Sequence, residues 1–305
     1  MLIFSHSDCL AHDTPRGHPE RVERLAAVEA GLAAVQAERR ACPMGSDDAV
    51  LRCHAPAYLA RVKALVPPRG RVALDGETWL SPGSLDAALR AVGGICAAVD
   101  AVVAGEARTA FVAARPPGHH ATRGAAMGFC LFGTAAIGAK HALDHCGLSR
   151  VAIVDFDVHH GNGTQDLLWD EARCLFISSH QMPLYPGSGA EEERGAHGQI
   201  LNIPLRAASG GAAMRAAYAA RVFPALRDWA PELIVVSAGF DAHRDDPLGG
   251  LGWDTEDYAW LTAQICDVAA GSAGGRVIST LEGGYDLTAL QASVAAHAAV
   301  LEARG

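Results

Sequence analysis

The order of hydrophobic and polar residues switches between two periods along most of the chain. Apolar residues at helical spacing predict helices over residues 18–40, 81–105, 133–145, 163–170, 211–229, 254–271 and 286–303. Short, almost continuous apolar runs between them predict strands: TAFVAAR (109–115), RVAIVDFD (150–157), RCLFISS (173–179), ELIVVSAGFD (232–241) and RVISTLEGGY (276–285). Apolar strands that alternate with helices indicate an α/β fold of three αβα layers around a central, mostly parallel sheet.

Two segments depart from this alternation. Residues 66–84 and 180–210 are rich in glycine, proline and charge, and they predict long loops on one rim of the sheet. Loops of this length within a compact domain are usually functional. Because no linker, repeat or low-complexity segment interrupts the pattern, we expect residues 1–305 to form a single domain.

The composition narrows the partners and the compartment. The net charge of −9 argues against the basic surface that direct nucleic-acid binding needs, and it favours a basic partner instead. The eight cysteines are scattered without a CxxC pair, which indicates free thiols in a reducing environment. No signal-peptide pattern opens the sequence, and no apolar run reaches the length of a membrane span. We therefore expect a cytoplasmic protein that binds neither nucleic acid directly nor a membrane.

Residues with chemical character stand where the predicted strands end. RPPGHH (115–120) follows the first of these strands, Asp155 and Asp157 close the second, Asp241 closes the fourth and Tyr285 the fifth. In open α/β sheets, ligands bind in the crevice outside the carboxyl ends of the strands. The sequence therefore predicts that these residues meet in one active site.

The run DFDVH predicts a metal site. Asp155, Asp157 and His159 share a face if the chain stays extended. One carboxylate and the imidazole of this run, joined by Asp241 from another strand end, provide three ligands and leave an open position, as a catalytic divalent ion requires. These ligand types suit Zn²⁺, and Fe²⁺, Co²⁺ and Mn²⁺ stay open. The alternative is a structural cluster of salt bridges.

Other strand ends offer groups for acid–base chemistry. The prolines and glycine of RPPGHH form a rigid turn that aims His119 and His120. Imidazoles titrate near neutral pH, so this pair can act as general base and general acid around a metal-bound water. The two glycines before Tyr285 let its hydroxyl approach a developing oxyanion. The simpler alternatives are histidines of a surface loop and a tyrosine packed in the core.

Two loop aromatics, Phe129 and Tyr185, each stand beside a glycine or a proline. Core packing is the usual role of a lone aromatic residue. Two of them on one rim can instead form the walls of a narrow slot for an aliphatic chain.

The run DAHRD (241–245) matches a ligand pattern of the arginase-type ureohydrolases, which bind two Mn²⁺ ions. Those enzymes need a second run of acidic ligands near the end of the chain. The last predicted strand reads STLEGGY and has a single acid, so a two-metal site lacks ligands.

Six motifs, in one order across nearly the whole chain, resemble a known family. They are RPPGHHA (115–121), GFCLF (128–132), DFDVHHGNGTQ (155–165), YPGSG (185–189), SAGFDAHRDDPLGG (237–250) and LEGGY (281–285). The resemblance is to the zinc-dependent histone deacetylase-like amidohydrolases, in particular their class II and bacterial branch within the arginase–deacetylase superfamily. The opening HPERVERL (18–25) is similar to the first helix of that family. The resemblance implies the arginase/deacetylase-like fold.

By position, the resemblance implies a zinc-dependent deacetylase with one catalytic Zn²⁺ held by Asp157, His159 and Asp241. It assigns proton transfer to the tandem histidines, with His120 preferred as the donor to the leaving amine. It assigns the stabilisation of the oxyanion to Tyr285.

The remaining roles that the resemblance implies support this centre. Asp155 would orient His119 and, with Ser178, help to bind a structural monovalent cation, K⁺ or Na⁺. Asn162 would hold His120 in place of the Asp of class I enzymes. A neutral partner should raise the pKa of His120 less than a carboxylate would.

The resemblance implies the type of reaction more clearly than it implies the substrate. The acyl-lysine tunnel would be lined by Gly128, Phe129, Tyr185 and Leu248, with Tyr185 in place of the usual Phe. Polyamine-selective relatives carry an acid near the position of Leu248, so the leucine favours acyl-lysine in proteins or peptides. Acetylated polyamines are the alternative, because Asp75, Glu77 and the acidic run 191–193 lie in rim loops and can attract a cationic chain. A solvated loop is the simpler interpretation of 191–193.

A different class of function is a non-catalytic protein that binds or senses acyl groups. The loss of a metal ligand or of Tyr285 would indicate it, and all of these residues are present. The sequence leaves open the acyl-chain length and the oligomeric state, a homo-oligomer included. His160 has no assigned chemistry, and we expect it to be structural.

Overall fold

The computed structural model describes all 305 residues, and its centre is an eight-stranded sheet. Every neighbouring pair of strands in this sheet is parallel. In spatial order the strands are β2 (Glu38–Ala41), β1 (Leu2–Ser5), β5 (Thr109–Ala113), β10 (Val277–Leu281), β9 (Leu233–Ala238), β6 (Val151–Asp155), β7 (Cys174–Gln181) and β8 (Ile200–Leu205).

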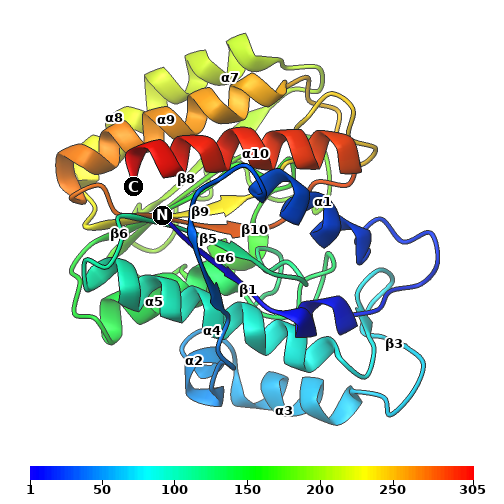
Figure 1. Cartoon of the computed structure of the whole chain (residues 1–305). Helices are drawn as coiled ribbons and strands as arrows, with labels where there is room; N and C mark the ends of the chain where they lie inside the picture. Colours follow the sequence, from blue (N-terminus) through cyan, green and yellow to red (C-terminus); the bar gives the residue numbers. More distant parts are fainter.

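Helices cover both faces of this sheet (Figure 1). One layer holds α1 (Glu23–Leu32), α7 (Gly211–Ala217), α8 (Phe223–Trp229), α9 (Thr255–Ser272) and α10 (Leu287–Arg304). The opposite layer holds α4 (Ser84–Val103) and α5 (Thr134–Asp144), with α2 (Asp47–Leu51) and α3 (Pro56–Leu65) outside them. The three-layer α/β fold predicted from the sequence is thereby confirmed.

Three smaller helical pieces and a hairpin complete the chain. They are the 3₁₀ helix η1 (Ser7–Ala11), the short helix α6 (Asn162–Leu167), a π-helical turn η2 (Tyr218–Val222) between α7 and α8, and the antiparallel hairpin of β3 (Val72–Ala73) and β4 (Trp79–Leu80). None of the helices is both long and apolar enough to cross a membrane. All eight cysteines are free thiols, as the sequence predicted.

The helix predicted over 18–40 is too long. Helix α1 ends at Leu32, and residues 38–41 form the edge strand β2 instead. This strand reads ERRA and pairs only with β1, so three of its four residues are exposed. An edge strand with charged side chains shows no hydrophobic alternation, so a periodicity argument assigns its residues to the preceding helix. The four-residue β1 was also not predicted.

The long loops predicted on the rim contain regular structure. Residues 180–210 include the end of β7 and the whole of β8, and residues 66–84 include the β3–β4 hairpin. Helices α2 and α3 were not predicted either. Strand β8 forms because its backbone pairs with β7, a tertiary contact that local composition does not report.

The four strands that end in the predicted site residues are the central ones. Strands β5, β10, β9 and β6 are consecutive in the sheet, and every residue of each is buried. Because parallel strands share one carboxyl edge, the loops after these four strands start side by side. The fold therefore places the four predicted strand ends in one crevice.

Candidate metal centre and active site

The loop after β6 is shaped by its own carboxylates. The backbone N–H of Asp157 donates to Asp155 Oδ1 at 3.1 Å, and the N–H of His159 donates to Asp157 Oδ1 at 2.9 Å. Aspartates that accept from the amide two residues further on form Asx turns. The run is therefore a chain of turns and not the extended segment that was expected.

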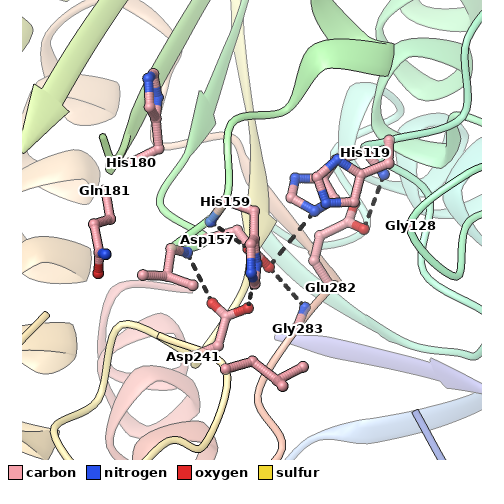
Figure 2. Close-up of polar contacts among 12 residues, drawn as sticks. His119, Gly128, Asp157, His159, His180, Gln181, Asp241, Glu282 and Gly283 are labelled. Atoms are coloured by element: carbon pink, nitrogen blue, oxygen red, sulfur yellow. Dashed lines mark hydrogen bonds and ion pairs between the residues drawn. The ribbon is translucent and has the colours of Figure 1, made fainter. Parts of the chain in front are cut away.

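Asp157, His159 and Asp241 come together in the crevice. Nδ1 of His159 lies 3.1 Å from Asp157 Oδ1 and 3.2 Å from Asp241 Oδ2. Figure 2 shows the imidazole standing between the two carboxylates. One ligand atom from each residue lies within 4.8 Å of the others, and all three residues are buried.

Backbone amides fix the two carboxylates in place. The N–H of Val158 donates to Asp241 Oδ1 at 2.8 Å, and the N–H of Gly283 donates to Asp157 Oδ2 at 2.9 Å. A Cβ at Gly283 would lie 2.1 Å from Asp241 Oδ2, so only glycine allows this approach. Neither carboxylate depends on its neighbour for orientation.

The charges of this cluster fit a divalent cation. Burial, followed by the charge of Asp157, raises the pKa of Asp241 to about 7. Burial opposes a charge on His159, but hydrogen bonds to both carboxylates outweigh it and raise its pKa to about 10. The only basic partners of the two acids are His159 and, at 3.7 Å from Asp157, His119. A divalent ion would satisfy both acids at once, and the buried Asp–His–Asp set is chemically suited to Zn²⁺.

The tandem histidines enter from the loop after β5. A carboxylate that the sequence argument did not use holds this loop: Glu282 Oε2 accepts from the N–H of Gly118 at 2.7 Å and of His119 at 3.1 Å. Nδ1 of His119 lies 3.0 Å from Asp155 Oδ2, and Nδ1 of His120 lies 2.7 Å from the amide oxygen of Asn162. The two imidazoles therefore have different partners.

The pKa values of the two histidines move apart. Burial opposes a charge on His119, but Asp157 and Asp155 outweigh it, so its pKa is raised. Burial lowers the pKa of His120, and the charges of His119 and His159 lower it further. The electrostatics thus favour a cationic His119 beside a neutral His120.

Tyr285 is held by side chains on both sides of the loop after β10. Its N–H donates to Asp246 Oδ2 at 2.7 Å, and the Arg24 guanidinium stacks on its ring at 4.9 Å. The edge of the Phe129 ring packs against it, with 5.9 Å between the ring centroids. Asp246 and Arg24, like Glu282, were missed by the sequence analysis because their roles depend on contacts far apart in the chain.

A cavity of about 330 Å³ opens above the metal centre. Its lining includes the four predicted tunnel residues together with His120, His159 and Tyr285: His18, Pro19, Gly76, Glu77, His120, Gly128, Phe129, His159, Leu184, Tyr185, Leu248 and Tyr285. Gly128 has a φ of +54° and touches the His120 ring, where a Cβ would lie 2.4 Å from Cδ2. The lining combines the apolar side chains of Phe129, Leu184 and Leu248 with the polar groups of His120, His159 and Tyr285.

Comparisons with known proteins agree with this geometry. Residues 18–301 match the histone deacetylase domain. The chain is 42% identical over 274 residues to the histone deacetylase-like amidohydrolase of Pseudomonas aeruginosa, over 88% of this chain and 71% of that protein. It is 40% identical over 301 residues to an uncharacterised Synechocystis protein, over 96% of this chain and 97% of that protein. The crystal structure of the HDA15 HD domain superposes with a TM-score of 0.91 at 31% identity, over 99% of this chain and 90% of that chain.

The chain belongs to the histone deacetylase family. The resemblance inferred from the six motifs is thereby confirmed, and with it membership of a family of hydrolases. The family generally uses Zn²⁺, and the Asp157, His159 and Asp241 cluster is a group in this chain that can hold such an ion. The individual residue roles stay predictions.

Ser178 and His160 do not line the cavity of this deacetylase-family protein. Ser178 is the register partner of Asp155 in the β6–β7 ladder, and its Oγ lies 3.0 Å from His180 Nδ1. Its part in a monovalent cation site stays a prediction. His160 is buried, with Nδ1 on Ser188 and Nε2 on Gln165, contacts typical of a structural residue.

The rim acids differ in position. Glu77 lines the cavity and is exposed, and His18 Nε2, which faces its carbonyl oxygen at 2.9 Å, fixes the loop. The run 191–193 does not reach the cavity. Glu191 pairs with Arg221 at 3.0 Å, and Glu193 accepts from the N–H groups of residues 189 and 190. Glu193 is thus a loop cap and not the solvated acid that was expected.

Proposed function

We propose that this chain is a zinc-dependent deacetylase that removes acetyl or other short acyl groups from Nε-acyl-lysine in proteins or peptides. One observation carries the proposal: His159, a member of the Asp157, His159 and Asp241 cluster, lines a cavity that His120 and Tyr285 also line. An acyl carbonyl that enters this cavity would meet the metal, an imidazole that transfers protons and a hydroxyl that donates a hydrogen bond.

Asp157, His159 and Asp241 would hold the ion. When bound, Zn²⁺ supplies a Lewis acid that polarises the acyl carbonyl and lowers the pKa of a water molecule. The amides of Val158 and Gly283 keep the carboxylates oriented as ligands in its absence and its presence.

The two tandem histidines have different roles: one transfers protons and the other stabilises charge. His120 donates its Nδ1 proton to a neutral amide oxygen, which leaves Nε2 as a lone-pair base. It accepts the proton of the attacking water and then returns it to the leaving amine. His119, which pairs with Asp155, would in its protonated form stabilise the negative charge that develops on the substrate. Asp155 and Ser178 would also help to seat a structural K⁺ or Na⁺.

Tyr285 completes the oxyanion site. Its hydroxyl donates to the acyl oxygen, and burial raises the pKa of this phenol, so it remains a proton donor throughout the working pH range. The contacts with Asp246 and Arg24 hold the ring without using its hydroxyl.

The cavity wall favours an aliphatic chain. Phe129, Leu184, Tyr185 and Leu248 give the narrow apolar surface that the methylene groups of lysine require. Glu77 supports a second candidate, an acetylpolyamine amidohydrolase, because an exposed carboxylate at the cavity can bind a distal ammonium group. Turnover of acetyl-lysine peptides by the zinc-loaded protein, compared with acetylputrescine and acetylspermidine, separates the two. Preference for the amines would replace the first proposal with the second.

The variant Tyr285→Phe tests the mechanism. We expect the zinc content to be unchanged and kcat to fall about 100- to 1,000-fold, the usual cost of removing one oxyanion donor. Tyr258→Phe is the matched control, because Tyr258 is also buried but its hydroxyl has no hydrogen-bond partner and lies outside the cavity. Near wild-type turnover by zinc-loaded Tyr285→Phe would remove the proposed role. No turnover of any acyl substrate by the zinc-loaded wild type would favour a non-catalytic acyl-binding protein.

A further inference from the structure

A second cluster of metal-ligating side chains lies outside the candidate active site. Asp100 on α4 and His141 and His145 at the end of α5 place one ligand atom each within 4.8 Å of the others. Nε2 of His141 lies 2.7 Å from Asp100 Oδ1. The thiol of Cys146 donates to the same oxygen, with 3.5 Å between Sγ and Oδ1. A carboxylate from α4 and two imidazoles from the end of α5 thus converge, and the Cys146 thiol, just beyond α5, contacts the same carboxylate.

Helical spacing explains why the two histidines face the same way. Residues four positions apart stand one turn above each other on a helix, and His141 and His145 stack with 4.7 Å between centroids at an interplanar angle of 24°. A histidine pair at this spacing is a recurrent zinc-binding arrangement. Asp100 is added by α4, which packs directly against α5.

The donor set matches the coordination of zinc. Four protein ligands of nitrogen, oxygen and sulfur type form a tetrahedral site, in which neighbouring donors lie roughly 3.5 Å apart. The side chain of His145 is exposed, so it is free to adjust to that spacing. The charges of a carboxylate and a thiolate would balance those of a divalent ion. The thiol proton leaves to solvent when the metal–sulfur bond forms.

The charged residues next to this cluster form their ion pairs elsewhere. Asp144, next to His145 in sequence, turns away to Arg173 at 2.8 Å and to Arg52 at 4.0 Å. The side chain of Asp100 is 53% exposed and has no lysine or arginine partner. An ion can therefore reach the carboxylate from solvent without displacing a lysine or an arginine, and it would replace the contact between Asp100 and His141.

The cluster lies at the edge of the sheet opposite the candidate active site. Asp100 is in the last turn of α4, ahead of β5, and His145 and Cys146 follow α5, ahead of β6. They stand near the amino ends of these strands, whereas Asp157 and Asp241 follow strands at their carboxyl ends. Figure 1 shows α4 and α5 together in one layer.

We propose that Asp100, His141, His145 and Cys146 form a second site for a zinc-like divalent ion that clamps the end of α5 to α4. The site is structural, because it lies at the opposite edge of the sheet from the cavity. A ligand that binds the folded state and not the unfolded state stabilises the fold in proportion to its saturation, so the clamp makes the stability of the protein depend on free zinc.

Cobalt substitution tests this site apart from the first one. Asp157, His159 and Asp241 include no sulfur, so a thiolate-to-cobalt charge-transfer band reports the second site alone. We expect metal-free wild type to bind two equivalents of Co²⁺ and to develop this band. His145→Ala should bind one equivalent, and Cys146→Ser should lose the band. Controls are His197→Ala, an exposed histidine elsewhere, and Cys266→Ser, a free thiol on α9.

Thermal unfolding gives a second readout. Addition of Zn²⁺ beyond the first equivalent should raise the unfolding midpoint of wild type and of His197→Ala by a few degrees, and should leave His145→Ala unchanged. A single equivalent in wild type, or a band that persists in Cys146→Ser, overturns the proposal. The result is independent of deacetylase turnover, so failure of the proposed function leaves this test intact.

Discussion

At the carboxyl edge of the sheet, Asp157, His159 and Asp241 are all buried, whereas at the amino edge Asp100 and His145 are exposed. Both groups bring histidine and carboxylate atoms within 4.8 Å. The buried acids accept hydrogen bonds from the amides of loops that follow strands. The exposed cluster is built on side chains at the ends of two helices and has no such amide support for Asp100.

The difference shows what burial demands of a metal centre. A buried carboxylate costs several kcal/mol to desolvate unless partners surround it. In the first cluster, backbone amides donate hydrogen bonds to the carboxylates, and the glycine at 283 leaves room for their close approach. These partners also fix the ligands before an ion arrives, which favours tight binding and defined geometry. The exposed cluster needs no such support, and its ligands must be ordered by the ion itself. We therefore expect weaker and more reversible binding there.

The largest expected effect comes from removing a buried ligand charge. Asp241→Asn keeps the size of the side chain and an oxygen for the N–H of Val158, but it removes one of two anionic ligands. We expect loss of the zinc at this site and a fall in kcat/KM of more than about 100-fold, because even partners of ligands cost 10- to 100-fold. Asp267→Asn, at an exposed aspartate paired with Arg304, should retain turnover.

The corresponding aspartate-to-asparagine substitution in the exposed cluster tests the difference between the two clusters. Asp100→Asn should lose the thiolate-to-cobalt band and keep the first equivalent of metal. Metal counting and far-UV circular dichroism on both variants give the result. If Asp241→Asn retained zinc and turnover, the buried cluster would not be the catalytic metal centre.

A smaller effect is expected from a buried histidine outside both clusters. Burial lowers the pKa of His54 to about 4, and the ring is held by the N–H of Gly133 and the carbonyl of Thr122. In the unfolded chain a histidine has a pKa of about 6.5. As pH falls from about 6.5 to about 4, the unfolded state therefore binds a proton that the folded state refuses, and roughly 3 kcal/mol of stability is lost.

The variant His54→Gln removes this titration. Its free energy of unfolding, measured in urea at about pH 7 and about pH 4, should fall less between the two conditions than that of wild type, by about 3 kcal/mol. The exposed histidine variant His197→Gln should follow wild type. An identical acid loss in His54→Gln and wild type would show that His54 is not held neutral.

The smallest expected effect concerns the partner of His120. Asn162→Asp replaces a neutral acceptor at 2.7 Å with a carboxylate, which raises the pKa of the imidazole by about one unit or more. A general base works only when neutral, so turnover is lost as pH falls through this pKa. We expect the acidic limb of the kcat/KM profile to move to higher pH by about that amount. An unmoved limb would assign the base to another group.

The sequence predicted the central fold because the four middle strands are buried on both faces and so read as continuous apolar runs. It failed at β2, an exposed edge strand that reads ERRA, and at β8, which lies in a segment rich in loop residues. Strand formation at both places is decided by pairing with a neighbour. Local composition does not contain that information.

The candidate site divides in the same way. Asp157, His159, Asp241, the tandem histidines and Tyr285 were found because each stands at the end of an apolar run. Glu282 and Asp246 were missed, although they hold the His119 and Tyr285 backbones, because an acid in a loop has no periodicity that reveals its partner. The Asp100 cluster was missed for a related reason, since Asp100 lies on another helix, 41 residues away from His141.

The residue pattern was enough to predict the αβα architecture, the edge of the sheet where the polar side chains gather, and the types of those side chains. These follow from hydrophobic periodicity and from the rule that parallel strands share one carboxyl edge. Only the tertiary structure decided which acids face which imidazoles, that Asp155 turns to His119 while Asp157 turns to His159, and that a second donor set closes between α4 and α5. Contacts of this kind depend on how distant segments pack together, and the order of hydrophobic and polar residues along the chain does not report that packing.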